Sequence, residues 1–269
     1  MLSRHLILSA VLSLSSLGGA QQGAQQPGRT TSPGSDTACA ATFASGKGHN
    51  ATQYCVTKNG NIAQFSRGDQ EFIQVGNIVE GYAMCDFTAS PAVGYFDYAS
   101  SDSGNLEPST FSSKASNAIS TRITRDGIWE ITNTISKVAA NAMSPGAAKV
   151  SMKIRNLTPV DRVVFVTRVA DIDFAQGGTL DFNNDFDFTA NTAFGLEPVL
   201  ASGLSLTNNT FPVLPATYTL NTPVAPDPCN PGANRASQPF VGDGSIAATY
   251  ELLVPKQGAK TIVLTYKPI

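Results

Sequence analysis

Short apolar runs with a two-residue period recur along most of this chain. In residues 149–155, Val150, Met152 and Ile154 share one side and polar residues share the other, which predicts a half-buried β-strand. Residues 162–170 are apolar on both sides and predict a more central strand. Because a short turn-forming segment separates the two, we expect them to form an antiparallel hairpin.

The same pattern predicts strands elsewhere. A second antiparallel hairpin is expected near the C-terminus, from residues 246–254 and 261–266. Residues 128–135 predict a strand with Trp129 and Ile131 on its core side. A small hairpin is expected over residues 54–65, around a Lys-Asn-Gly turn.

These strands together indicate the fold class. No stretch keeps a helical apolar stripe between caps, and no internal repeat is visible. We therefore predict an all-β protein, with residues 39–269 forming a single large antiparallel β-sandwich domain. Residues 197–240 are rich in proline and are expected to be mostly a long loop.

The N-terminus predicts export. Residues 1–20 combine a basic start, an apolar run too short to span a bilayer and small residues before Gln21, which is typical of a signal peptide. No later segment is apolar enough to span a membrane. Residues 21–38 are rich in Gln, Gly, Pro and Ser and predict a flexible linker. We expect a secreted protein, extracellular or periplasmic, of unknown oligomeric state.

Composition narrows the function classes. Only 14% of residues are charged and the net charge is -2, with no basic stripe that would attract nucleic acid. The predicted mature chain has one histidine, His49, in a glycine-rich segment typical of a surface loop. The serine-hydrolase elbow, the zinc-protease helix, the phosphate-binding loop and the dinucleotide turn are all absent from the sequence. Any hydrolysis would have to depend on carboxylates.

The chain has four cysteines, Cys39, Cys55, Cys85 and Cys229. An even number in an exported chain predicts two disulfides. Zinc is the alternative, but the sequence contains no CxxC pair. Three pairings are possible, and we favour Cys55 with Cys85 and Cys39 with Cys229.

Several short segments resemble sequences from a family of uncharacterised secreted bacterial proteins. These segments are CVTKNGNI, EGYAMCD, DSGN, DGIWEIT, and KIRNLT followed by VTRVADID. The resemblance covers most of residues 50–269. It implies export and a β-rich fold, and it implies no activity. The run from RNLT to RVVFVTRVADID is also similar to hairpins of mutarotase-like and glycosidase-associated sandwiches, a likeness that does not establish sugar chemistry.

The segment 171–187 is the one candidate site. It carries five aspartates and no Lys or Arg, and its second half alternates between acidic or amide residues and phenylalanines. Like charges on one face of a strand repel unless a cation neutralises them, and Ca²⁺ takes about six to eight oxygen ligands outside the cell. The possible calcium ligands are Asp171, Asp173, Asp181, Asn183, Asp185 and Asp187.

Two other interpretations of this segment stay open. The aspartates can form a solvated strand edge that discourages pairing with other chains, which is the interpretation that we favour over calcium. They can also supply the two carboxyls of a glycosidase, about 5–10 Å apart, although the single tryptophan is expected in the core. Tyr95, Phe96 and Tyr98 can likewise form a glycan patch or simply end a strand.

The sequence as a whole favours a secreted, non-enzymatic binding or structural module. We expect no cofactor unless it is calcium, and a glycan or a cell-surface component is the partner class that fits best. The alternative is a carboxylate-dependent carbohydrate-active enzyme or carbohydrate-binding domain.

Overall fold

The computed structural model describes residues 36–73, 79–173, 183–187, 189–197, 202–210, 216–220, 227–231, 233 and 235–269. They belong to one compact unit, Thr31–Ile269. The predicted signal peptide, and the linker up to residue 35, lie outside the described residues, so both stay predictions. Within the described ranges, no helix has the length and apolarity needed to cross a membrane.

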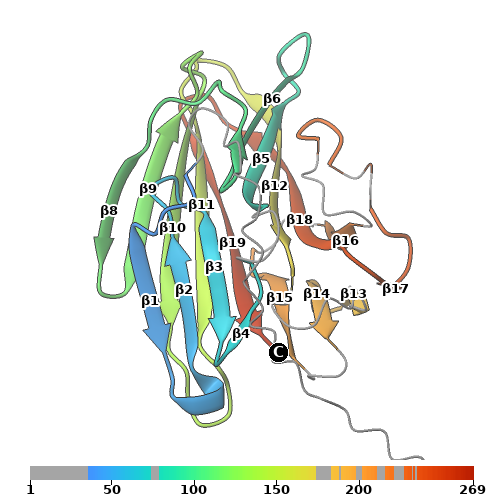
Figure 1. Cartoon of the computed structure of the whole chain (residues 1–269). Coiled ribbons are helices and arrows are strands. Elements are labelled where there is room, and N and C mark those ends of the chain that lie inside the picture. Colours follow the sequence, from blue (N-terminus) through green and yellow to red (C-terminus); the bar gives the residue numbers. More distant parts are fainter. Residues whose placement is uncertain are drawn as a thin grey trace, which may run out of the picture. The chain divides into compact units, whose positions relative to one another are not determined.

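The strands form three sheets, and each pairing within the described chain is antiparallel (Figure 1). The nine-stranded sheet contains, in order, β17 (Phe240–Val241), β13 (Asn183–Asp187), β14 (Thr192–Glu197), β15 (Ser202–Asn208), β19 (Ala259–Pro268), β11 (Ala147–Asn156), β10 (Trp129–Val138), β9 (Asn117–Ile123) and β8 (Thr110–Lys114). The six-stranded sheet contains β16 (Ala216–Leu220), β18 (Ser245–Val254), β12 (Arg162–Asp171), β5 (Glu80–Asp86), β6 (Val93–Tyr98) and β7 (Ser101–Asp102).

A smaller sheet lies against both of these. It contains β1 (Ala41–Ser45), β2 (Thr52–Val56), β3 (Ile62–Arg67) and β4 (Gln70–Glu71), and a 3₁₀ turn, η1 (Gly48–Asn50), connects its first two strands. Its β1 contacts β10 of the nine-stranded sheet, and its β3 contacts β5 of the six-stranded sheet.

One apolar core lies between the sheets, and it follows from the alternation in the sequence. Val150, Met152 and Ile154 of β11 are fully buried, as predicted, and they belong to the same core cluster as Val164 and Val166 of β12. Burying each such side chain stabilises the fold by about 1.5–3 kcal/mol. The predicted all-β sandwich is confirmed.

The two predicted long hairpins are wrong. Residues 149–155 lie in β11, which pairs with β10 and β19, whereas 162–170 lie in β12, which pairs with β18 and β5. The C-terminal strands β18 and β19 are likewise in different sheets. Each connection is therefore an arch that crosses from one sheet to the other. The physical reason is that both strands of each pair bury an apolar face in the same core, from opposite sides.

The two arches lie side by side and are held by Asn156. Its side-chain amide, which is fully buried, donates hydrogen bonds to the carbonyl oxygens of Val160, Val254 and Pro255 at 2.6, 3.3 and 3.2 Å. The backbone N–H of Gln257 in the second arch also donates to the carbonyl of Thr158 in the first, at 3.0 Å. These bonds satisfy backbone groups that a hairpin ladder would otherwise pair.

The other predicted elements are partly confirmed. Strand β10 buries Trp129 and Ile131 completely, and β2 and β3 form the small hairpin. The prediction that residues 197–240 are mostly loop is wrong for the two segments that form β15 and β16. In β15, Leu204 and Leu206 are fully buried, which shows that this part of the segment has its own apolar alternation.

Two disulfides are present, as predicted, but the favoured pairing is wrong. Cys39 bonds to Cys55, and Cys85 bonds to Cys229. The pairing of β1 with β2 brings the first two together, since the Ala40 N–H donates to the Val56 carbonyl. Cys55 and Cys85 lie in different sheets. Pro228, beside Cys229, packs over Gly94, the residue paired with Cys85.

Candidate functional site

The turn between β2 and β3 lies between the two large sheets. The Lys58 carbonyl accepts a hydrogen bond of 2.8 Å from Ser120 Oγ on β9, and the Gly60 carbonyl accepts one of 3.3 Å from Arg168 Nη2 on β12. Gly60 has φ +84, and a Cβ there would lie 2.9 Å from Ser120 Cβ. Only glycine fits this conformation and this space, so the Asn59-Gly60 turn of the sequence is built for an interior position.

A buried ion network lies beside this turn. Arg122, on β9, is 3% exposed, and its Nη1 lies 2.7 Å from Asp97 Oδ2 on β6. Its Nη2 lies 3.2 Å from Asp102 Oδ2 on β7. The network therefore joins the nine-stranded sheet to the six-stranded sheet. Removing one member of such a pair leaves an uncompensated buried charge, which costs about 3–5 kcal/mol.

Hydrogen bonds complete this network. Arg122 Nε donates to the Glu107 carbonyl at 2.8 Å, and Asp97 Oδ1 accepts from Asn61 Nδ2 at 2.8 Å. Burial raises the pKa of Asp97 to about 6, and the nearby guanidinium limits this rise. Burial alone would lower the pKa of Arg122, but the charge and hydrogen bond of Asp97, together with the charges of Tyr82 and Asp102, outweigh it and the pKa is raised. The guanidinium is consequently fixed in place and charged.

A second buried pair lies on the other side of the turn. Arg168 Nη2 lies 2.5 Å from Glu80 Oε1, and both side chains are fully buried. The Tyr266 hydroxyl donates to the same carboxylate at 3.0 Å, and the Ile62 N–H donates to Glu80 Oε2. Burial raises the pKa of Glu80, although Arg168 opposes the rise. Both side chains are enclosed in the core and each charge has an opposite partner there, so we regard the pair as structural.

A cleft of about 610 Å³ opens directly over the Arg122 network. Asp102 and Arg122 line it from β7 and β9, and Leu106 and Pro108 add an apolar wall. The turn between β2 and β3 contributes Lys58 and Asn59, and Arg125 and Ser109 complete the rim. The cleft thus combines fixed donors and acceptors with an aliphatic surface, which is the usual composition of a small-ligand site.

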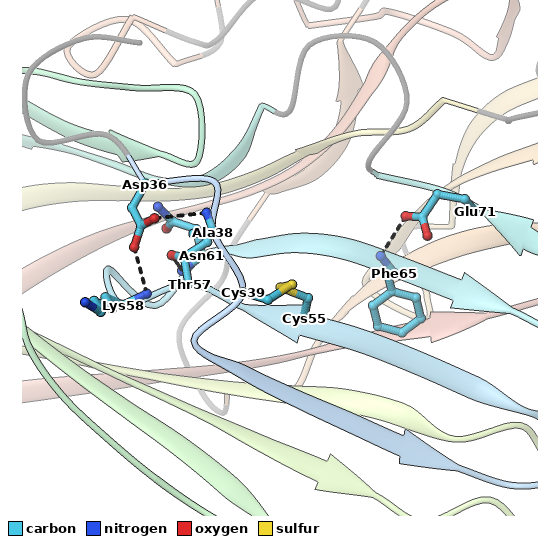
Figure 2. Close-up of a disulfide and its surroundings, with 9 residues drawn as sticks. All are labelled: Asp36, Ala38, Cys39, Cys55, Thr57, Lys58, Asn61, Phe65 and Glu71. Carbon is cyan, nitrogen blue, oxygen red and sulfur yellow. Dashed lines mark hydrogen bonds between the residues drawn. A yellow bond between two sulfur atoms is a disulfide. The ribbon is translucent and has the colours of Figure 1, made fainter. Parts of the chain in front are cut away.

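Asp36 closes one side of the cleft, three residues before the Cys39–Cys55 disulfide (Figure 2). Its Oδ1 accepts a hydrogen bond from the Ala38 N–H at 2.9 Å, and its Oδ2 accepts one from the Lys58 N–H at 3.2 Å. Asp36 and Ala38 belong to the segment 21–38, so at least its last residues contact the sandwich. Both carboxylate oxygens of Asp36 are engaged by the backbone.

The predicted calcium ligands fall into two groups in the structure. Asp171 and Asp173 lie at and just after the end of β12, and Asn183, Asp185 and Asp187 lie on β13; Asp181 is outside the described residues. The alternation on β13 is as expected, with Asn183 and Asp187 exposed and Phe186 packed against the core. In the part of the chain that the structure describes, no group of three acidic, His or Cys side chains is placed to hold a metal ion. Calcium binding stays a prediction.

Asp187 and Asp171 show opposite environments within this segment. The exposed carboxylate of Asp187 accepts hydrogen bonds from the Thr189 hydroxyl and the Ala190 N–H, and these lower its pKa. Asp171 is 2% exposed, and burial and the charge of Asp173 raise its pKa to about 8. Burial and the charge of Asp243 raise the pKa of Asp173 to about 6.

Other residues singled out in the sequence have ordinary structural roles. His49 is exposed in η1, as expected for a loop residue. Trp129 is fully buried and donates from Nε1 to Asp86 Oδ2 at 3.1 Å. Of the three aromatic residues on β6, Tyr95 and Tyr98 are 1% exposed and Phe96 is half-buried against a core cluster, so they belong to a packed strand.

Sequence reasoning missed the cleft, because its residues come from separate segments of the chain. One signal was present: in β9, Arg122 lies on the same face of the strand as Ala118 and Ser120, which are both buried. A charged residue at a core position predicts a buried partner. The sequence does not show which carboxylate provides it.

No family model matches this chain, and no curated protein matches its sequence. Solved structures share a distant likeness. A putative aldose 1-epimerase from Escherichia coli K12 has 9% identity and a TM-score of 0.49, over 85% of this chain and 99% of that one. The Slr1438 protein from Synechocystis sp. PCC 6803 has 6% identity and a TM-score of 0.48, over 85% and 95%.

The heparan sulfate lyase HepC from Pedobacter heparinus has 10% identity and a TM-score of 0.46, over 87% of this chain and 35% of the lyase. At these identities and scores, the likenesses support no conclusion about function.

Proposed function

We propose that this protein is an exported, non-enzymatic β-sandwich module that binds a glycan in the cleft over Arg122. The observation that carries the proposal is the composition of the cleft. Sugar hydroxyls both donate and accept hydrogen bonds, so a site for them needs donors and acceptors that are fixed in advance. Lys58, Ser109 and Arg125 supply donors at the rim, and the Ser109 hydroxyl can also accept. The buried Arg122–Asp102 pair holds the strands beneath this rim together, and the exposed Pro108 offers an aliphatic surface for the sugar's C–H face.

The state of the carboxylates favours binding over turnover. Two-carboxylate hydrolysis needs one group that gives a proton and one that attacks or activates water. In the cleft, Asp102 accepts from Arg122 and from the Gly104 N–H, and Asp36 accepts from two backbone N–H groups. Neither described carboxylate is left available for proton transfer, which supports a binding module over the alternative of a carbohydrate-active enzyme.

A glycan array, run beside a panel of glycosidase substrates on the oxidised protein, tests this proposal. We expect selective binding and no turnover. Ser109→Trp places a large side chain at the rim and should abolish binding, whereas Ser113→Trp on the exposed strand β8 should leave it unchanged. Turnover of any sugar, or equal binding by both variants, would contradict the proposal.

A further inference from the structure

Some charged groups of the cleft already have close hydrogen-bond or ion-pair partners within the protein, and others are exposed at its rim. Its two carboxylates are both engaged. Asp36 accepts from the N–H groups of Ala38 and Lys58, and Asp102 accepts from Arg122 and the Gly104 N–H. Arg122 is engaged in turn, by Asp97 and Asp102. These groups are three carboxyls against one guanidinium, so any attraction for a ligand anion has to come from other residues of the cleft.

The two cations at the rim are in a different state. Lys58 is exposed, and its ammonium makes no ion pair with any described residue. Arg125 Nε lies 3.9 Å from Glu107 Oε1, and the two side chains are 60% and 53% exposed. An exposed pair with this separation contributes almost nothing to stability, so a ligand anion can replace Glu107 as the partner of Arg125.

We infer that the cleft selects glycans that carry an anionic group, held between Lys58 and Arg125. This inference rests on the proposed function and adds the class of glycan. A sugar carboxylate and a sugar sulfate both provide the required acceptor oxygens and negative charge. Ser109, which lines the same cleft, would then contact the hydroxyls of the same sugar.

The net charge of the whole protein does not by itself explain binding of an anionic glycan. The net charge is -2, so the molecule as a whole does not attract a polyanion. Binding of an acidic polymer has to come from a local group of cations. Because the rim is exposed, salt should screen the attraction, with a screening length of about 10 Å at 0.1 M.

The test uses three polymers: polygalacturonate for carboxylates, dextran sulfate for sulfates, and unmodified dextran as the neutral reference. Affinity electrophoresis of the oxidised full chain should show binding to one or both acidic polymers, at least about tenfold tighter than to dextran. Raising the salt from about 0.05 M to 0.5 M should weaken binding to the acidic polymers several-fold.

Variants then assign the binding to the rim. Lys58→Gln with Arg125→Gln should weaken binding to the acidic polymer about tenfold or more, whereas Lys149→Gln, at an exposed position of β11, should not change it. An equal loss with Lys149→Gln, or no loss with the rim variants, would overturn the inference. Both rim side chains are exposed, and an unchanged melting temperature will show that the variants fold.

The outcomes separate this inference from the function on which it rests. If dextran binds as tightly as the acidic polymers and Ser109→Trp abolishes this binding, the cleft is a glycan site but the anionic selectivity is wrong. If neither the array nor the polymers give binding, the proposed function fails and the inference fails with it.

Discussion

Two groups of aspartates at the six-stranded sheet contain buried carboxyls in opposite surroundings. Asp97 and Asp102 lie on β6 and β7 around the guanidinium of Arg122. Asp171 and Asp173, at the end of β12, lie near Asp243, and the causes of their raised pKa values include no cation. The comparison shows that burial alone does not decide the state of a carboxylate. In the first group a fixed cation limits the rise in the pKa of Asp97, whereas in the second burial and repulsion favour protonation.

The largest effect is expected from removing the cation of the first group. Arg122→Met leaves Asp97 fully buried without its ion-pair partner, so the free energy of unfolding should fall by about 3–5 kcal/mol. Urea unfolding at pH 7 measures this. Arg155→Met, which removes an exposed pair with Glu130, is the control and should cost less than about 1 kcal/mol. Equal small losses would show that the buried network does not hold the sheets together.

The second group should respond in the opposite direction. The pKa of Asp171 is about 8 in the folded protein, and its ordinary value in an unfolded chain is about 4. The folded state therefore holds this proton more tightly, and its stability should fall as the pH rises from about 4 to about 8. Asp171→Asn removes the charge and keeps an acceptor for the Ser245 hydroxyl.

A tenfold difference in proton affinity is worth about 1.4 kcal/mol, so the shift in the pKa of Asp171 sets an upper limit of about 5 kcal/mol, and Asp171→Asn should stabilise the protein at pH 8 by roughly 2 kcal/mol or more. At about pH 4 the variant and the parent should unfold at the same urea concentration. A variant that is less stable than the parent at pH 8 would show that Asp171 is charged and compensated, by a cation or by a bound metal ion.

The smallest effect is expected on β13. Asp185→Asn removes one charge from the alternating segment, and on the solvated-edge interpretation the free energy of unfolding should change by less than about 0.5 kcal/mol. Millimolar calcium should leave the melting temperature close to its value in chelator. A rise of several degrees with calcium, reduced by Asp185→Asn, would instead support the predicted calcium site.

The sequence was a good guide to strands and a poor guide to their partners. Alternation predicted which residues of β11 and β19 are buried, because a strand directs successive side chains to opposite faces. It does not determine whether a short turn returns the chain to the same sheet or carries it across the core. Asn156 shows why: two of its three bonds to the arches join residues about a hundred positions apart.

The candidate site was less predictable than the fold. The aspartate segment drew attention because its charges are adjacent in sequence, whereas the cleft joins Asp36, Lys58, Asp102 and Arg122 from distant segments. A disulfide pairing depends on the same kind of long-range geometry, which explains why Cys85 bonds to Cys229 across 144 residues. The sequence does not show which charged residues of the cleft form ion pairs with each other, and the structure is needed to assign these pairs.

Hydrogen–deuterium exchange, measured with and without the glycan that binds most tightly on the array, tests the central claim most directly. The account predicts slower exchange in three segments that line the cleft, residues 58–59, 102–109 and 122–125. Slower exchange confined to another surface, such as residues 183–185 and 239–241, which line a second cavity of about 290 Å³, would contradict it.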